Sequence, residues 1–490
     1  MSVDELSPAA LEVTSRRGRL FGLGVFAATL TVLLVRFLVP RPVGLSDNGD
    51  GFRVLCGAGI PWKGKPEQFA RLEYTVPAGE CDATYLLSQS WFARIARSLG
   101  GLLGLESTLS LVVLGVLMSV LAAAAVALIV VGLPYSRRVR GFAAVGLLLV
   151  VGDSAFFGYF ASVLGEGAAF LGILLALGGL LVAARPGWWR YAGLAVLLFG
   201  GIVAVNAKVQ TLMILPLLAL AVLLVRPAGV RGLKRWLPLV FVIGALAGGT
   251  AYAQQTVEPA KLPDGSLAAR PGDDSREINV FNTIFLTIVD GRHDAVADLA
   301  ALGLPASFAQ YAGNGWWHQK PATMDPEYPK YREQISRHNV VGYVATHPLR
   351  TLEILNGAAG DLLTARPPYL GSFDQSAGFA PEAREFRVPI ASTSTNLLAP
   401  LGFFALLPIW ALIAWRGWKT RRDAVGVALG FLLAVAAGQF ALAALGDGLE
   451  NVKHQVIALY CTLLAVVPAL VTFAHQERSE SLTSPTSNVP

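Results

Sequence analysis

The chain has 490 residues, of which 54% are hydrophobic and only 15% are charged, against about 25% charged residues in an average soluble domain. This composition indicates a membrane protein. The net charge of +6 comes from basic clusters at the ends of apolar stretches, where it orients the chain and contacts lipid head groups. A nucleic-acid-binding protein would need a basic face on a soluble domain, and the sequence has none.

Apolar stretches of about 20 residues can cross a hydrocarbon layer of about 30 Å, and the sequence predicts about ten of them. They cover residues 20–40, 108–133, 141–162, 167–184, 191–206, 209–225, 236–253, 396–415, 424–446 and 453–474. The first resembles a signal sequence, but it is long and lacks a convincing small-residue cleavage site, so we interpret it as a retained span. The sequence therefore predicts an all-α polytopic membrane protein with both termini on the same side.

Charges are distributed unevenly between alternate connections. The basic clusters are Arg16, Arg17 and Arg19; Arg137, Arg138 and Arg140; Arg185 and Arg190; Arg226, Arg231, Lys234 and Arg235; and Arg416, Lys419, Arg421 and Arg422. By the positive-inside rule these clusters and both termini face the cytoplasm of a plasma-membrane protein. The other connections carry the carboxylates of Asp47, Asp50, Asp153, Glu166, Asp447 and Glu450. Gathered carboxylates on the outer face suggest chemistry there.

Four regions follow from this topology. Residues 1–253 form an N-terminal transmembrane module whose first outer loop covers 41–107, and residues 254–395 form a mainly helical extracytoplasmic segment. Residues 396–475 hold the C-terminal transmembrane helices. The tail 476–490 is rich in Ser, Thr and Pro, which is typical of a disordered end. No internal repeat of the kind found in many transporters is present.

The first outer loop contains Cys56 and Cys81, which we expect to form a disulfide in an oxidising compartment. In the same loop, residues 90–99 have the pattern of an amphipathic helix lying on the outer surface, with Arg94 and Arg97 reaching head groups.

Three short motifs carry the chemistry. The first is Asp47-Asn48-Gly49-Asp50-Gly51-Phe52-Arg53, directly after the first span. Its glycines would let a substrate approach two carboxylates. The same residues also suit an ordinary turn, but two Asp residues followed by Arg exceed what a turn needs.

The second motif surrounds Asp153. Counting 1.5 Å per residue from Arg140 places Asp153 about 20 Å along a helix, inside the outer half of the membrane. A carboxylate there is by default a functional hypothesis, and packing against a partner helix is the alternative. Tyr159 and Ser162 could supply hydrogen bonds, and Glu166 begins the next span.

The third motif lies between the last two spans. It holds Asp447, Glu450, Lys453 and His454, and a helix beginning near Leu449 would place Glu450 and His454 on one face. Lys453 and His454 could present positive charge to a phosphate. Lys208, beside Asn206, is the single basic residue in its outer turn. We expect Lys208 to pair with Asp153 or with a lipid phosphate, or to extend toward head groups.

These motifs resemble the GT-C superfamily of membrane glycosyltransferases, and most closely the bacterial WsfD-like glycan hexosyltransferases. The stretches Val280-Phe281-Asn282-Thr283-Ile284-Phe285, Leu299 to Pro305, Tyr311-Ala312-Gly313 and Asp447 to His454 are also similar to that family. Gly51, between Asp50 and Phe52, departs from the family's pattern.

The resemblance implies transfer of a hexose from a polyprenyl-phosphate carrier to a glycan or lipid acceptor on the outer face, with inversion. Asp50 is the first choice for the general base and Asp47 the second. Lys208, Lys453 and His454 would neutralise the departing phosphate. The remaining substrate-binding candidates are Arg53, Asp153, Tyr159, Glu166, Asn206, Asp447 and Glu450. Asp153 and Glu166 would hold the acceptor, or a divalent cation if one is used.

Three other functions fit the same features, one of them a non-enzymatic scaffold whose outer segment binds wall polymers. A lipid-linked polysaccharide ligase or polymerase would act on the same side with a diphosphate-linked donor, so donor identity distinguishes it. A transporter or flippase for lipid-linked sugars would usually place its carboxylates near the midplane.

Overall fold

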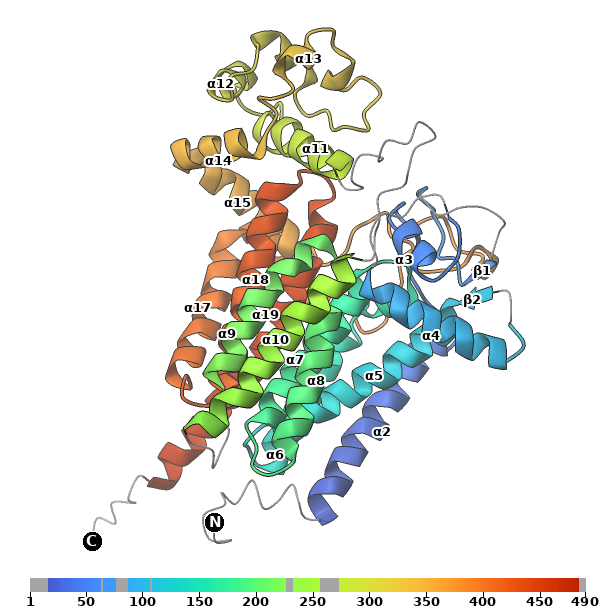
Figure 1. The fold of residues 1–490 in the computed structure, drawn as a ribbon, viewed down its shortest axis with the longest axis vertical. Helices are drawn as coiled ribbons and strands as arrows, with labels where there is room; N and C mark the ends of the chain where they lie inside the picture. The colour runs from blue at the N-terminus through green and yellow to red at the C-terminus, as the bar shows by residue number, and fades with distance from the viewer. Residues whose placement is uncertain are drawn as a thin grey trace.

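The computed structural model describes residues 16–62, 65–75, 87–105, 108–225, 232–255 and 273–483. Helices dominate these residues, as the sequence predicted (Figure 1). They form a long bundle, a lobe beside one end of it that contains α3 and α4, and a helical lobe beyond the same end that contains α11–α15 (Figure 1). Two strands of three residues each, one in the first loop and one directly before α5, are the departure from a purely helical fold among the described residues.

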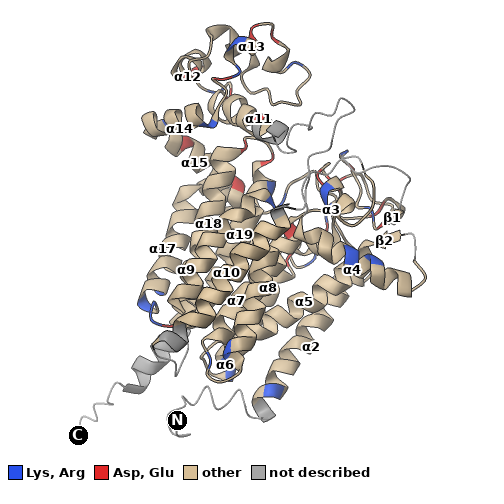
Figure 2. Ribbon diagram, viewed as in Figure 1, with Lys and Arg blue, Asp and Glu red and all other residues tan. Residues whose placement is uncertain are grey.

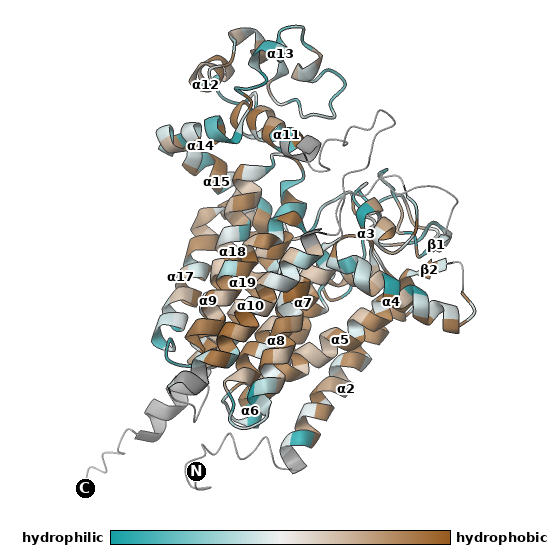
Figure 3. Ribbon diagram, in the orientation of Figure 1, coloured by the Kyte–Doolittle hydropathy of each residue, from teal (hydrophilic) through white to brown (hydrophobic). Residues whose placement is uncertain are grey.

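The bundle contains a helix for each predicted span. These helices are α2 (Arg16–Leu38), α5 (Leu111–Gly132), α6 (Arg137–Val151), α7 (Glu166–Ala183), α8 (Trp189–Val205), α9 (Ile214–Leu224), α10 (Leu233–Gln255), α17 (Phe403–Lys419), α18 (Ala424–Gly446) and α19 (Asn451–Thr483). Within the described residues, six of them are long and apolar enough to cross a membrane alone. Hydrophobic residues predominate along the helices of the bundle (Figure 3).

Two predicted spans are interrupted. The span predicted over 141–162 ends as an α-helix at Val151, and a turn and the short 3₁₀ helix η2 (Phe157–Ala161) follow. The span predicted over 396–415 is divided between α16 (Ile390–Leu398), η8 (Ala399–Leu401) and α17. Gly402, with φ of 50°, makes the second break. At the C-terminus α19 runs to Thr483, whereas the prediction placed a disordered tail from 476.

Glycines bring α7 and α8 into close contact. A Cβ added to Gly172 would lie 2.4 Å from Ala204 N, and one added to Gly179 would lie 2.4 Å from Leu197 N. Small residues at this spacing let two helix backbones approach closely. This packing buries every residue of α7 and places its first residue, Glu166, beside the turn that follows α8.

The first-loop lobe contains α3 (Phe52–Gly57), α4 (Ser88–Leu102) and the antiparallel pair β1 (Glu73–Thr75) and β2 (Thr108–Ser110), with Tyr74 opposite Leu109. The guanidinium groups of Arg94 and Arg97 on α4 donate to carbonyls at the end of α3, at Gly57 and Ala58. Contact of these two arginines with lipid head groups stays a prediction. They fix α3, and hence the motif before it, to α4.

The helical lobe has its own hydrophobic core. Its elements are α11 (Asp273–Asn282), the π-helix η4 (Thr283–Ile288), α12 (Ala295–Ala301), η5 (Ala306–Tyr311), η6 (Ala322–Met324), α13 (Tyr328–Tyr331), α14 (Arg337–Thr346) and α15 (Pro348–Leu363). Phe281, Phe285 and Phe308 are buried at its centre. The short η7 (Gln375–Ala377) lies in the segment that leads back to the bundle.

Charge is segregated along the bundle. Basic residues gather near the ends of α2, α6 and α17 that lie away from both lobes, and acidic residues gather where α18 meets α19 beneath the helical lobe (Figure 2). The predicted segregation of charge is thus seen along the bundle, while the assignment of these ends to the two faces of a membrane stays a prediction.

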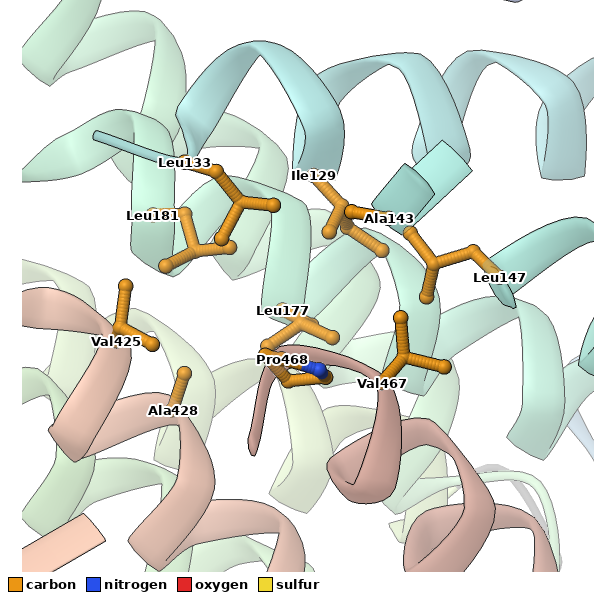
Figure 4. A pocket seen from close by; sticks show the side chains of 10 residues that line it. All are labelled: Ile129, Leu133, Ala143, Leu147, Leu177, Leu181, Val425, Ala428, Val467 and Pro468. Atoms are coloured by element: carbon orange, nitrogen blue, oxygen red, sulfur yellow. The ribbon is translucent and has the colours of Figure 1, made fainter. Parts of the chain in front are cut away.

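A small cavity lies between α5, α6, α7, α18 and α19 (Figure 4). Its lining is entirely apolar and consists of Ile129, Leu133, Ala143, Leu147, Leu177, Leu181, Val425, Ala428, Val467 and Pro468. Such a lining offers no hydrogen bond to a sugar or a phosphate, so this cavity does not suit either ligand.

A buried ion pair joins the end of α2 to the segment after the helical lobe. Arg36 forms a salt bridge with Glu385, and the two side chains are only 4% and 5% exposed. Arg36 Nε also donates to Gly152 O at 3.2 Å, where α6 ends. Glu385 in turn accepts from Arg387 Nε at 2.7 Å. Three parts of the chain distant in sequence therefore meet at one buried charge pair.

We expect Glu385→Gln to destabilise the protein by about 3–5 kcal/mol, because removal of one partner leaves the other charge buried and uncompensated. Thermal unfolding in detergent measures the effect. Lys330→Gln is the control, since its pair with Glu327 is 70% and 45% exposed and should contribute less than about 1 kcal/mol. Equal shifts for the two variants would contradict the structural role of the Arg36–Glu385 pair.

Candidate active site

The loop between α2 and α3 is organised by Asp47. This side chain is 1% exposed, and its Oδ1 accepts the N–H of Gly49 at 2.9 Å and of Gly51 at 2.8 Å. Burial raises the pKa of the Asp47 carboxyl to about 6, although the two N–H groups act in the opposite direction. A Cβ on Gly51 would lie 2.5 Å from Asp47 Oδ2, so glycine is required there for the turn to close.

Asp50 is the carboxylate of this motif that reaches the surface of the site, with 41% of its side chain exposed. Arg53 Nη1 donates to its Oδ1 at 2.6 Å, and Lys453 Nζ donates to its Oδ2 at 2.5 Å. The surrounding protein alone would raise the pKa of the Asp50 carboxyl, but Lys453 and Arg53 outweigh this effect and hold that pKa well below its usual range. Asp50 is therefore ionised at neutral pH.

The turn between α18 and α19 supplies the partner of Asp50. Lys453 has a side chain with no exposed surface, and its Nζ also lies 2.9 Å from Glu450 Oε2. Asn48 Nδ2 donates to the same Glu450 oxygen at 2.8 Å and lies 3.3 Å from Asp50 Oδ2. The first and third sequence motifs thus meet directly, although they are about 400 residues apart.

The rest of this turn differs from the prediction in one respect. α19 begins at Asn451 rather than near Leu449, so Glu450 precedes the helix and does not share a helical face with His454. His454 Nδ1 lies 3.4 Å from Asp447 Oδ2, and its carbonyl accepts from Gln210 Nε2 at 3.1 Å. Burial raises the pKa of the Asp447 carboxyl to about 6.

A second ion pair lies at the adjoining turn. Lys208 Nζ is 2.6 Å from Glu166 Oε1, and the side chains are 19% and 1% exposed. The prediction that Lys208 pairs with Asp153 is wrong, because its partner in the protein is Glu166. Pairing of Lys208 with a lipid phosphate stays a prediction. Lys208 also acts electrostatically on Asp50 and Asp447, so both ion pairs belong to one site.

Asp153 lies apart from this site. It is fully buried, and its two oxygens accept the backbone N–H of Ala155 at 2.8 Å and of Ser392 at 3.0 Å. It follows the end of α6 instead of lying within a continuous helix, because the chain turns at Gly152. Asp153 therefore joins α6 to α16, which corresponds to the packing alternative.

Tyr159 and Asn206 were predicted to bind substrate. Tyr159 is 1% exposed and packs edge-on against Phe170, and its hydroxyl has no hydrogen-bond partner among the described residues. Asn206 is buried at the end of α8, where its Nδ2 donates to Ile202 O at 2.8 Å. A substrate-binding role for these two residues stays a prediction.

The described residues contain neither the metal site nor the disulfide that the sequence suggested. Among the described residues, no group of three or more His, Cys, Asp or Glu side chains could hold a metal ion. Asp153 and Glu166, the pair suggested for a divalent cation, bind different partners. Cys56 lies in α3, whereas Cys81 falls outside the described residues, so the disulfide stays a prediction.

Sequence reasoning missed two features of the site. Asn48 contacts the carboxylates of both Asp50 and Glu450. Its position between two Asp residues was a local signal that could have identified it as a site residue. Tyr369 lies close enough to Glu450 and Lys453 to interact with them electrostatically. Its position follows from backbone pairing, in which Ser46 N donates to Gly371 O at 2.8 Å and Gly44 N donates to Ser372 O at 3.0 Å. No local sequence pattern indicates that pairing.

Comparison with known proteins identifies the family. The sequence profile of the YfdI N-terminal transmembrane domain matches residues 12–482. The chain belongs to this family. A search of curated proteins gave no match.

Two solved structures of an oligosaccharyltransferase from Archaeoglobus fulgidus are similar at 15% identity. One is tethered to an acceptor peptide, and the other, of AglB, is in complex with an inhibitory peptide and a dolichol-phosphate. The matches cover 97% of this chain but only 52% and 53% of those chains, with TM-scores of 0.39 and 0.41. The chain thus spans about half the length of these structures, and a likeness of this size does not establish a shared activity.

The raised pKa of Asp47 predicts a pH-dependent effect of Asp47→Asn. The carboxyl titrates near pH 6 in the folded protein, above its usual value of 3.8, so its ionisation costs stability as the pH rises through this window, by up to about 3 kcal/mol. The amide keeps an oxygen for the Gly49 and Gly51 N–H groups but does not titrate.

We expect the stability of Asp47→Asn, relative to the unsubstituted protein, to increase between pH 4.5 and pH 7.5 in thermal unfolding. Asp47→Ala, which loses the acceptor oxygen, should be less stable than the unsubstituted protein at both values. An unchanged difference between Asp47→Asn and the unsubstituted protein across this range would show that Asp47 does not titrate there.

Proposed function

We propose that the chain is a membrane glycosyltransferase that moves a hexose from a polyprenyl-phosphate carrier to a cell-envelope glycan or lipid acceptor. One observation carries the proposal. The partly exposed carboxylate of Asp50, at one end of an apolar helix bundle, is held by Arg53 of the same motif and by the buried Lys453 from the start of α19. A lipid-linked substrate would present its phosphate at an end of the bundle, beyond its apolar helices (Figure 3).

Asp50 suits the role of general base. Its ionised carboxylate can accept the proton of an acceptor hydroxyl as that oxygen attacks the anomeric carbon, while the bond to the carrier phosphate breaks. One displacement of this kind inverts the anomeric centre and needs no second carboxylate as nucleophile. Asp47 is the weaker candidate, because one of its oxygens is occupied by the Gly49 and Gly51 N–H groups and the side chain is buried.

The departing phosphate needs positive charge. Lys208 is the best candidate, because it is 19% exposed whereas Lys453 has no exposed surface. Phosphate oxygens could replace the Glu166 carboxylate as the partner of Lys208, at little electrostatic cost because one anion takes the place of another. The hexose specificity and the WsfD-like subgroup are parts of this proposal that rest on the resemblance in sequence.

A ligase or polymerase that uses a diphosphate-linked glycan is the second candidate, because it would employ the same cations. Transfer from a polyprenyl-monophosphate sugar by the purified protein, with no transfer from a diphosphate-linked glycan, supports the first function. The reverse result supports the second, and movement of a lipid-linked sugar without transfer supports a flippase.

Asp50→Asn should lower the rate of hexose transfer by about 10²–10⁴-fold, the usual contribution of a general base. Transfer from a radiolabelled polyprenyl-phosphate hexose by purified protein measures it. Asp374→Asn is the control, since Asp374 is a partly exposed aspartate outside the site, where its Oδ1 accepts the N–H of Ser376 at 2.9 Å. Undiminished turnover by Asp50→Asn would exclude Asp50 as the base.

Lys208→Ala should raise the KM for the lipid donor by about tenfold or more, the effect of losing a hydrogen bond from a charged group, with a smaller change in the acceptor KM. Lys208→Arg, which keeps the charge, should retain most of the affinity. Glu166→Gln frees the ammonium of Lys208 from its carboxylate, so the donor KM should fall. Equal losses of donor and acceptor affinity in Lys208→Ala would exclude the phosphate-binding role.

A further inference from the structure

Glu450 has a backbone conformation that glutamate rarely adopts. Its φ is 56°, and only two other described residues besides glycines, Glu382 and Val388, have positive φ. A non-glycine residue in this region is strained and persists only where the surrounding structure holds it, and such residues cluster at functional sites. Glycines stand nearby at Gly446 and Gly448, yet the strained position is occupied by a carboxylate.

The conformation directs the Glu450 carboxylate back across the start of α19. Its Oε2 lies 2.9 Å from Lys453 Nζ and 2.8 Å from Asn48 Nδ2. Lys453 Nζ is also 2.5 Å from Asp50 Oδ2. Two carboxylates therefore compete for one buried ammonium, and Asn48 lies within reach of both.

We propose that Glu450 is a positioning residue: by sharing the Lys453 ammonium with Asp50, it prevents that ammonium from neutralising Asp50 completely and keeps Asp50 able to accept a proton. This inference rests on the proposed function, in which Asp50 is the base. Glu450 would thus act on the reaction through Lys453 and would not contact the substrate.

The charges that face Asp50 support this role. Arg53 from α3, Lys453 from α19 and Lys208 from the turn before η3 (Val209–Met213) all favour the ionised form of Asp50. Asp47 and Glu450 carry the neighbouring negative charges, and His454 and Tyr369 are the other titratable groups close by. Without the Glu450 carboxylate, the Lys453 ammonium would act more strongly on Asp50, and a carboxylate held more tightly by a cation is a weaker base.

The same loss of charge has the opposite effect on the donor. Arg53, Lys453, Asp50 and Glu450 together are electrically neutral, and removal of the Glu450 carboxylate leaves one surplus positive charge. That surplus attracts a phosphate, so the donor KM should not rise. A residue that binds substrate directly would behave differently, because its removal would raise KM and leave the pH dependence unchanged.

The test compares Glu450→Gln and Glu450→Gly with the unsubstituted protein in hexose transfer measured between pH 2.5 and pH 9, because the lowered pKa of Asp50 places the acid limb of the profile below pH 3.8. Glutamine keeps the length and the strained backbone, whereas glycine relieves the strain and favours correct folding. In both variants we expect the acid limb of the kcat/KM profile to move down by about one pH unit. We also expect kcat to fall by about tenfold, with no rise in donor KM.

Glu382→Gln is the matched control, because Glu382 has φ of 60° but is exposed outside the site, and its profile should be unchanged. An unchanged acid limb in either Glu450 variant, or a raised donor KM, would overturn the positioning role. The proposed function fails separately: it is excluded if the unsubstituted protein transfers no hexose or if Asp50→Asn transfers at the full rate.

Discussion

Lys453 Nζ is completely buried and lies 2.5 Å from Asp50 Oδ2 and 2.9 Å from Glu450 Oε2. A buried ammonium without anionic partners is strongly unfavourable, so the fold must bring carboxylates to it. One comes from the loop after α2 and the other from the turn before α19. The first loop, the last helix and the bundle that carries them are therefore held together at a single charged atom, and the geometry of Asp50 depends on that contact.

The cations of the site form ion pairs with carboxylates of the chain before any substrate is present. Asp50 and Glu450 pair with Arg53 and Lys453, and Glu166 pairs with Lys208. Such pairing makes a buried polar site compatible with folding. It also means that an anionic substrate has to replace one of the internal carboxylates. Glu166 is fixed at the first residue of the buried helix α7, and its partner Lys208 lies in a turn, so of the two it is Lys208 that can reorient.

The sequence was sufficient to locate the helices, because long apolar stretches and basic clusters are local signals. Each predicted span has its helix, and the breaks at Gly152 and Gly402 displaced only the boundaries of two of them. The partners of individual charges were harder to predict. Lys208 pairs with Glu166 because the close glycine-mediated packing of α7 against α8 brings the start of α7 beside the turn after α8. Asp153 accepts the N–H of Ser392, which is 239 residues away. No residue spacing in the sequence predicts these contacts.

Two parts of the site differ in how firmly they are held. The loop of Asp47 and Asp50 is fixed on both flanks, since Ser46 pairs with Gly371 and the carbonyl of Asp47 accepts Glu67 N at 2.7 Å. Arg366, which is 7% exposed, donates to Leu370 O at 3.2 Å and so braces the segment that holds Gly371. The turn at Glu450 instead stores backbone strain and is held through side chains. Local strain of this kind is released when the compensating contacts are lost. If substrate binding moves a carboxylate in this site, we expect Glu450 to move and not Asp50. Asp50 would then keep its position while the surroundings of its partner Lys453 change.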